Sequence, residues 1–326
     1  MRIPVTLALI MATAAIGGVQ SQPTFRADVN LPVVSAVVRD AGDKLVRGLT
    51  RDDFELREDG QPVNIATFAE ASTDARTSLD DGRFVVLLLD DYSTHPQFTS
   101  RIKAVANGFV DRMGPKDVMS VVMLNGGRSV TTQRPSEVRA AINHSQGYGK
   151  AFVSPANPAR HAMENISSLA AQLAGVPHRR KVIVCIGPAA TFNPATHVSG
   201  NQGEAGVAMG ETARANVTTY VIDPLGLTEK NALSTRAIDD NVARNRGVQE
   251  KGEGFRLYQD GFAFESGGFA FANTNDYASP IDQVWEESGN YYLLGYEPAR
   301  RDNRRHSIEV RLKKANLTVR ARRTRG

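Results

Sequence analysis

The sequence has little cysteine and lacks the common signatures of catalytic and nucleotide-binding sites. Cys185 is the single cysteine among 326 residues, which excludes an intramolecular disulfide and the iron–sulfur, zinc-finger and CxxC redox sites that need several thiolates. A GxSxG elbow, a GxGxxG after a strand and a GxxxxGK[ST] loop are all missing. The six histidines show no HExxH or HxH spacing. Serine hydrolase chemistry, a backbone phosphate cradle and a zinc site therefore have no support in the sequence.

A local excess of charge of one sign occurs at the carboxyl end of the chain. The chain carries a net charge of +4, yet residues 300–326 hold eleven Lys and Arg against two acidic residues. Such a basic end can bind a polyanion or anionic lipid, but outward Lys and Arg also protect the edges of β-sheets. We favour the second interpretation.

A long hydrophobic run is confined to the amino terminus. Arg2 precedes an apolar stretch over residues 5–16, and small residues, including Val19 and Ser21, precede Gln22. This pattern is typical of a secretory signal peptide over residues 1–21, removed near Ser21. The stretch is shorter than the ~20 residues that a spanning helix needs. We therefore expect a periplasmic or secreted protein whose mature chain has no transmembrane segment.

The two ends of the mature chain both predict β-structure. Residues 22–75 contain short strand patterns with turn signals at 41–43 and at Asp59-Gly60. Residues 299–326 contain two alternating runs, at 306–314 and 317–323, with a turn at 315–316. Neither set is large enough to form a stable sheet by itself. We therefore predict one small β domain built from both chain ends.

The middle of the chain, residues 80–298, predicts an α/β domain. Continuous apolar runs at 84–89, 118–124, 181–186, 217–222 and 291–296 suit buried parallel strands. Helical patterns near 100–113, 136–144, 156–174, 204–215 and 278–288 alternate with them, and Thr99 or Ser100 can cap the first helix. The alternation indicates a doubly wound, mostly parallel sheet, with ligands expected at the carboxyl ends of its strands. Residues 225–265 give no clear pattern.

A cluster of oxygen-bearing side chains follows the strongest strand. Asp90, Asp91, Ser93 and Thr94 come directly after residues 84–89. Carboxylates and hydroxyls on such a loop are the ligands that Mg²⁺ or Mn²⁺ prefers. The alternative is structural: Asp90 caps the segment after it, while Ser93 and Thr94 bond loop amides.

At this point the chain resembles a known family. An acidic loop after the first strand is similar to the Asp-x-Ser-x-Ser metal-ion-dependent adhesion site of von Willebrand factor type A (VWA) domains. Segments covering nearly all of the mature chain resemble the VWFA-related family of exported bacterial proteins: NLPVVSAVVRDAGDKLVRGLTRDDFELREDGQPVNIATF, ANVTTYVIDPLGL, ESGGFAFANTNDYASPIDQVWEESGNYYLLGYEP and IEVRLKKANLTVRARR. The resemblance implies a VWA/Rossmann-like fold and a protein-binding role.

The adhesion motif departs from the family pattern. With Asp90 as the first aspartate, Tyr92 replaces the first serine and Thr94 the second. A shift by one residue fits Asp91 and Ser93 but brings His95 to the last hydroxyl position. In the family a further threonine ligand comes from the region that corresponds to residues 147–160, where this chain offers Ser154 as the hydroxyl. In the family a second aspartate normally ends the strand that corresponds to residues 181–186, whereas here Gly187 follows that strand. We expect Mg²⁺ or Mn²⁺ to bind weakly if at all.

The sequence therefore predicts a binding module and no enzyme. We expect an exported VWA-like domain that contacts an unknown protein or cell-envelope component through a degenerate adhesion site, with no specific nucleic acid as partner. One alternative is a metal-assisted hydrolase using Asp90 and Asp91, which needs a further acidic residue or histidine close to Asp90. The other is polyanion binding through the basic carboxyl end. Cys185, inside an apolar strand, is expected to be an inert core residue.

Overall fold

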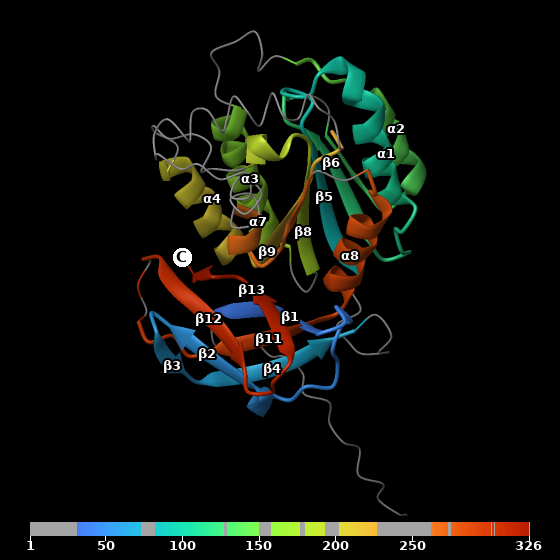
Figure 1. Ribbon diagram of the computed structural model, residues 1–326. Helices are drawn as coiled ribbons and strands as arrows, with labels where there is room; N and C mark the ends of the chain where they lie inside the picture. Colours follow the sequence, from blue (N-terminus) through green and yellow to red (C-terminus); the bar gives the residue numbers. More distant parts are fainter. Residues whose placement is uncertain are drawn as a thin grey trace, which may run out of the picture. The chain divides into compact units, whose positions relative to one another are not determined.

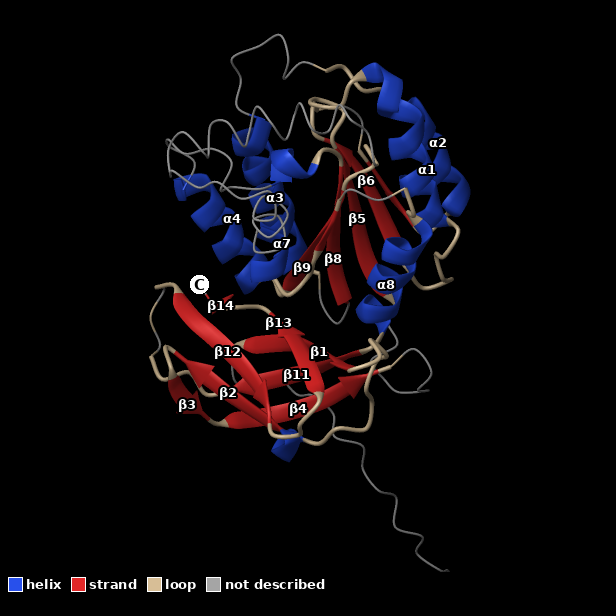
Figure 2. Cartoon of the chain, in the orientation of Figure 1, coloured by secondary structure: helices blue, strands red, loops and turns tan. Residues whose placement is uncertain are grey.

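A six-stranded, mostly parallel sheet occupies the middle of the chain (Figure 2). The computed structural model describes residues 31–72, 82–126, 129–149, 158–176, 180–192, 202–226, 262–272, 275–300, 302 and 304–325. In this described part the strand order is β10–β9–β8–β5–β6–β7, and β7 runs antiparallel to β6. The bounds are β5 Arg83–Leu89, β6 Val118–Met123, β7 Val130–Thr132, β8 Arg180–Ile186, β9 Val217–Ile222 and β10 Ala270–Phe271.

The central strand β5 is apolar on both faces because each face meets helices. Val85, Leu87 and Leu89 belong to one buried cluster, while Val86 and Leu88 belong to another. Successive side chains of a strand point to opposite faces, so a continuous apolar run supplies both clusters at once. β5 therefore pairs with parallel strands on both sides, β6 and β8.

Helices cover the two faces of this sheet (Figure 1). The first cluster includes residues of α1, α2 and α8, and the second includes residues of α3, α4 and α7. The bounds are α1 Thr99–Val110, α2 Pro135–His144, α3 Pro158–Ala174, α4 Gln202–Arg214, α7 Phe262–Glu265 and α8 Ala278–Gly289, with short 3-10 helices at Arg51–Asp53, Pro96–Phe98 and Ala189–Phe192. The predicted doubly wound α/β arrangement is confirmed.

Two antiparallel sheets combine strands from both ends of the described chain. Their orders are β13–β1–β11–β4 and β14–β12–β2–β3. The bounds are β1 Val33–Asp40, β2 Phe54–Glu58, β3 Gln61–Val63, β4 Ile65–Ala71, β11 Tyr291–Tyr296, β12 His306–Leu312, β13 Leu317–Ala321 and β14 Thr324–Arg325. β13 pairs with β1, and β12 pairs with β2. The predicted β domain built from both ends is therefore confirmed.

One strand lies in a different sheet from the one predicted. Residues 291–296 were expected in the parallel sheet, but β11 pairs antiparallel with β1 and β4. Tyr292, Leu294 and Tyr296 are buried in a third cluster with residues of β1 and β2. Alternate burial of this kind is characteristic of a strand with one core face.

The turn predicted at Asp59-Gly60 agrees with the structure, whereas the cap predicted for the first helix does not. Asp59 and Gly60 both have positive φ, +50° and +78°, as the two-residue turn between β2 and β3 requires. The predicted caps of α1 were wrong: Phe98 is its N-cap residue and makes no side-chain cap bond. Thr99 Oγ1 instead accepts a hydrogen bond from the Gly147 amide at 3.0 Å.

Two predictions lie largely outside the described residues. These are the signal peptide over residues 1–21 and most of the unclear stretch 225–265. Within the described ranges, none of the helices combines the length and apolar character needed to cross a bilayer.

Buried arginines join the antiparallel strands to helices of the α/β domain. Arg322, 4% exposed, donates to the Ala213 carbonyl at 2.6 Å and to Asn216 Oδ1 at 2.9 Å, just beyond α4. Burial lowers the pKa of Arg322 to about 10. Glu287 of α8 is fully buried and pairs with Arg39 of β1 and Arg320 of β13. Because each of these charged groups is bonded, it can remain buried.

The β domain contains a buried histidine whose protonation is coupled to stability. His306 Nδ1 lies 2.7 Å from Asp59 Oδ2, and His306 Nε2 lies 2.6 Å from Asp302 Oδ1. These two carboxylates raise the pKa of His306 above its ordinary value of 6.5, and His306 lowers the pKa of each carboxylate. The folded state therefore favours the imidazolium.

The His306→Gln variant should lose stability in acid more than in alkali. The ion pairs contribute fully below the unfolded pKa of His306 while the aspartates stay ionised, and the contribution disappears as pH rises through the raised folded pKa. We expect the melting temperature of the variant to fall below that of the wild type at about pH 6 and to approach it at about pH 9. Thermal unfolding across this range measures the difference. A difference independent of pH would contradict the coupling.

Candidate functional site

The four predicted site residues lie together on the loop that follows β5, at the carboxyl edge of the parallel sheet. Asp90 and Thr94 are fully buried, and Asp91 and Ser93 are 5% exposed. The loop begins at the sheet itself, because the Asp90 amide donates to the Ile186 carbonyl of β8 at 2.9 Å. The sequence prediction therefore located a polar cluster, and the structure adds that the cluster is buried.

Asp90 is a fully buried carboxylate. Its Oδ1 accepts a hydrogen bond from the Ser93 amide at 2.7 Å, and its Oδ2 has no hydrogen-bond partner. Burial raises the pKa of Asp90 to about 6, although the bond from the Ser93 amide acts in the opposite direction. Burial also raises the pKa of the neighbouring Cys185 thiol, which is the environment of an inert core cysteine.

The hydroxyl groups of the loop are also buried without bonds. Ser93 Oγ and Thr94 Oγ1 have no hydrogen-bond partner. Asp91 differs from them, since its Oδ1 accepts a bond from the Asn125 amide at 2.8 Å. The structural alternative thus explains the bonds to Asp90 Oδ1 and Asp91 Oδ1 but neither hydroxyl. Buried oxygens without partners are uncommon and cost stability.

Two positions of the adhesion motif differ from a working metal site. The ring of Tyr92, at the first serine position, packs against the buried cluster of the α3 and α4 face. Gly187 lies against Asp90: a Cβ atom at residue 187 would be 2.4 Å from Asp90 Cβ. Real Cβ atoms essentially never approach so closely, so this backbone excludes the second aspartate at position 187.

Another buried carboxylate of the same edge, Asp223, was missed from the sequence. It follows β9, within the segment VIDPLGL, and is 8% exposed. Asp223 Oδ2 accepts from the Ala189 amide at 3.0 Å, and Oδ1 accepts from the Leu225 amide at 2.8 Å. Burial raises the pKa of Asp223 to about 6. Because both oxygens bond backbone amides, Asp223 shapes the neighbouring loops.

The segment 145–149 fixes the site loop from outside. The Tyr148 amide donates to the Asp91 carbonyl at 2.8 Å, and the Gly149 amide donates to the Thr94 carbonyl at 2.9 Å. Tyr148 is 51% exposed, which makes it one of two exposed large hydrophobic residues in the described ranges. Sequence reasoning missed Tyr148 because its place beside the site follows from bonding between loops that are far apart in the sequence. Ser154 lies outside the described residues.

The residues present do not fit a tightly held divalent cation. Besides the two hydroxyls, the loop offers Asp90 Oδ2 as its buried carboxylate oxygen without a bond. The described ranges contain no group of three or more His, Cys, Asp and Glu side chains that could hold a metal ion. Mg²⁺ takes one or two carboxylates with several waters, and such a site close to Asp90 would be weak.

Comparisons with known proteins give similarities of structure at low identity. No family model matches the chain, and no curated protein matches it. The chain is similar to an aerotolerance-related membrane protein from Bacteroides fragilis, with 14% identity, coverage of 64% of this chain and 98% of that chain, and a TM-score of 0.40. It is also similar to a von Willebrand factor type A protein from Catenulispora acidiphila, with 10% identity, coverage of 90% and 73%, and a TM-score of 0.40.

The VWA domain of SpRpn10 is a third similar structure, with 9% identity, coverage of 62% and 94%, and a TM-score of 0.35. Because these TM-scores are below 0.5, the fold assignment depends on the strand order and helix placement of the chain itself. Those features agree with the α/β fold that the resemblance in the sequence implies.

Titration with Mg²⁺ or Mn²⁺ should reveal no micromolar site. The reason is the missing second carboxylate: Gly187 cannot be replaced by Asp without a collision with Asp90. Isothermal titration of the wild type and of Asp90→Asn should give the same weak heats. A micromolar site that disappears in Asp90→Asn would restore a functional adhesion-type metal centre and overturn this interpretation.

Proposed function

We propose that the chain is an exported binding module that contacts another protein or a cell-envelope component through the loops at the carboxyl edge of its parallel sheet. In open α/β sheets this edge is where ligands bind. Two loops meet there, residues 90–95 and residues 145–149, and backbone hydrogen bonds connect them. The contact surface is thus formed by loops attached to a rigid sheet, an arrangement that keeps a binding surface in place.

The observation that carries the proposal is the exposure of Tyr148 on this connected pair of loops. Its backbone is bonded to Asp91, while the residue is half exposed to solvent. Tyrosine is enriched among the residues that dominate the energy of protein interfaces, because its ring buries a large area and its hydroxyl can still bond. Tyr148 is therefore our candidate for the centre of the contact surface.

We propose further that the adhesion site is degenerate, so that binding does not depend on a bridging metal ion. Tyr92 in the apolar cluster and Gly187 against Asp90 support this view. A weakly bound Mg²⁺ or Mn²⁺ remains compatible with Asp90, Ser93 and Thr94. The contacts of the protein itself, including Tyr148, then supply the binding energy.

The export part of the proposal is supported by the sequence of residues 1–21. Its positive start, short apolar core and small residues before Gln22 are typical of a cleaved signal peptide. The mass of the intact protein recovered from the periplasm or the medium tests it. A full-length mass would contradict removal near Ser21.

The two alternative functions have less support. A metal-assisted hydrolase would need a general base near Asp90, yet both oxygens of Asp223 bond backbone amides. A polyanion surface would need unpaired cations. Several basic residues of the carboxyl end instead form ion pairs within the protein: Arg311 with Glu309, Lys314 with Asp53, Arg320 with Glu287 and Arg325 with Glu58.

Capture from envelope extract with matched variants tests the proposal. Tyr148→Ala should reduce capture of the partner roughly tenfold or more, as expected for a central interface tyrosine. Val207→Ala, which truncates the other exposed large hydrophobic residue, on α4, should leave capture unchanged. EDTA should also have no effect on capture.

Two results would contradict this view. Equal capture by Tyr148→Ala and the wild type would remove the proposed surface. Complete loss of capture in EDTA would require a metal-bridged contact.

A further inference from the structure

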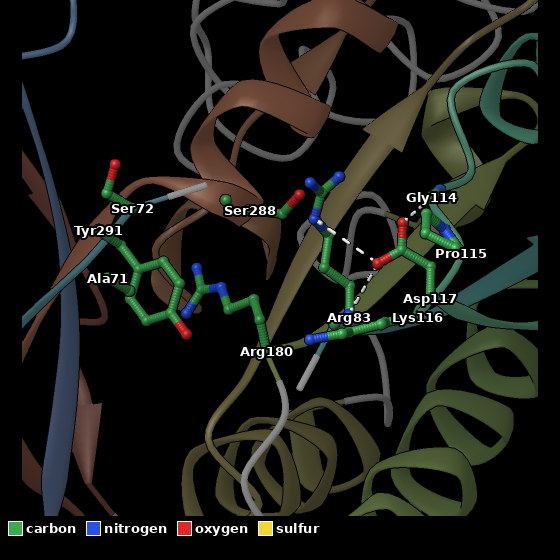
Figure 3. A pocket seen from close by; sticks show the side chains of 12 residues that line it. Ala71, Ser72, Arg83, Gly114, Pro115, Lys116, Asp117, Arg180, Ser288 and Tyr291 are labelled. Atoms are coloured by element: carbon green, nitrogen blue, oxygen red, sulfur yellow. Dashed lines mark hydrogen bonds and ion pairs between the residues drawn. The ribbon is translucent and has the colours of Figure 1, made fainter. Parts of the chain in front are cut away.

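A cavity with charged side chains in its wall lies at the opposite, amino-terminal edge of the parallel sheet (Figure 3). Its volume is about 320 Å³, at the lower end of the range for small-molecule sites. The starts of β5 and β8, the turn before β6, the end of α8 and the start of β11 contribute to its wall. The cavity shares no residue with the loops of the proposed contact surface.

Among the described residues, the wall of the cavity carries more positive than negative charge. These residues include Arg83, Lys116 and Arg180, together with the carboxylate of Asp117. Asp117 Oδ1 accepts from the Arg83 amide at 2.8 Å, and Oδ2 accepts from the Gly114 amide at 2.8 Å. Figure 3 shows this carboxylate turned toward Arg83 and Gly114. Asp117 is therefore engaged in holding the turn and Arg83.

Arg180 is buried beside the Tyr220 hydroxyl, and no acidic side chain of the described ranges forms an ion pair with it. It is 6% exposed, and its Nε and Nη1 atoms have no hydrogen-bond partner. Its guanidinium lies over the ring of Tyr291, 4.4 Å from the centroid, and Figure 3 shows the two side chains next to each other in the cavity wall. The buried carboxylate of Glu287 pairs with Arg39 and Arg320 instead.

A buried arginine of this kind lowers the stability of the protein when no ligand is bound. A buried donor without a partner loses the hydrogen bonds that water would give, and the loss is larger for a charged group. The planar guanidinium presents its donors in a fork that matches the two oxygens of a carboxylate or phosphate group. Stacking on an aromatic ring fixes the orientation of that fork. A bound oxyanion in the cavity would compensate the charge of the guanidinium.

We propose that this cavity binds a small oxyanion, a molecule bearing a phosphate or carboxylate group, with Arg180 as its hydrogen-bonding anchor. Arg83 and Lys116 add positive charge around the anion, and Asp117 keeps the turn that carries Lys116 in position. A cavity of this volume admits a compact metabolite-sized anion. The oxyanion site is independent of the contact surface at the other edge of the sheet.

Binding of inorganic phosphate to the full chain tests the proposal. Isothermal titration and thermal unfolding are measured in phosphate and in chloride at equal ionic strength. The chloride control is needed because phosphate also stabilises proteins that have no specific phosphate-binding site. We expect saturable binding and a raised melting temperature in the wild type. Arg180→Met should weaken binding roughly tenfold or more. In chloride alone, Arg180→Met should be at least as stable as the wild type, since it removes a buried unpaired charge.

Two further variants make the outcome unambiguous. Lys116→Met changes an exposed side chain of the cavity rim and should weaken phosphate binding without loss of folding. Arg134→Met removes an exposed arginine distant in the sequence, with a side chain 74% exposed, and should bind like the wild type. Succinate in place of phosphate distinguishes a carboxylate site from a phosphate site. If the wild type and the three variants showed the same binding and the same change of melting temperature with both anions, the effect would be one of the solvent, and the proposal would be overturned.

Discussion

The pairing of strands from the two ends of the described chain is the constraint on which the rest of the structure depends. β1 pairs with β13 and β11, and β2 pairs with β12. All of the α/β sheet, from β5 to β10, therefore lies in sequence between strands that must meet. Closing so long a loop costs entropy, and the shared core of Val34, Phe54, Leu294 and Ile308 offsets it. Arg322 and Glu287 then tie this core to α4 and α8.

The parallel sheet illustrates what a sequence pattern can and cannot predict. β5 was predictable because an apolar run must be buried on both faces, and both faces of β5 meet helices. Residues 291–296 contain a similar run, so apolarity alone placed β11 in the wrong sheet. The alternate burial of Tyr292, Leu294 and Tyr296 distinguishes the two cases. A two-residue strand such as β10 carries no periodic signal at all.

The candidate sites depend on long-range packing, which explains why only part of each was predictable. Asp90 and its neighbours were found because they directly follow a recognisable strand. Tyr148 is held next to them by backbone bonds between loops far apart in the sequence. Arg180 directly precedes the strand predicted over residues 181–186, and its burial over Tyr291 depends on a strand more than a hundred residues later. The collision of a Cβ atom at residue 187 with Asp90, which makes Gly187 necessary, likewise could not be predicted from the sequence. Residue type thus indicates local chemistry, whereas burial and partners require the fold.

Removal of the residues after Pro298 tests most directly the claim that the chain ends hold the structure together. The truncation deletes β12 to β14, so β1 and β2 lose their paired edges and the core loses Ile308 and its neighbours. Each buried aliphatic residue contributes about 1.5–3 kcal/mol, against a total stability of roughly 5–15 kcal/mol. We predict a protein that melts well below the intact chain and is rapidly cleaved by protease. A truncated protein with an unchanged melting temperature would contradict the account.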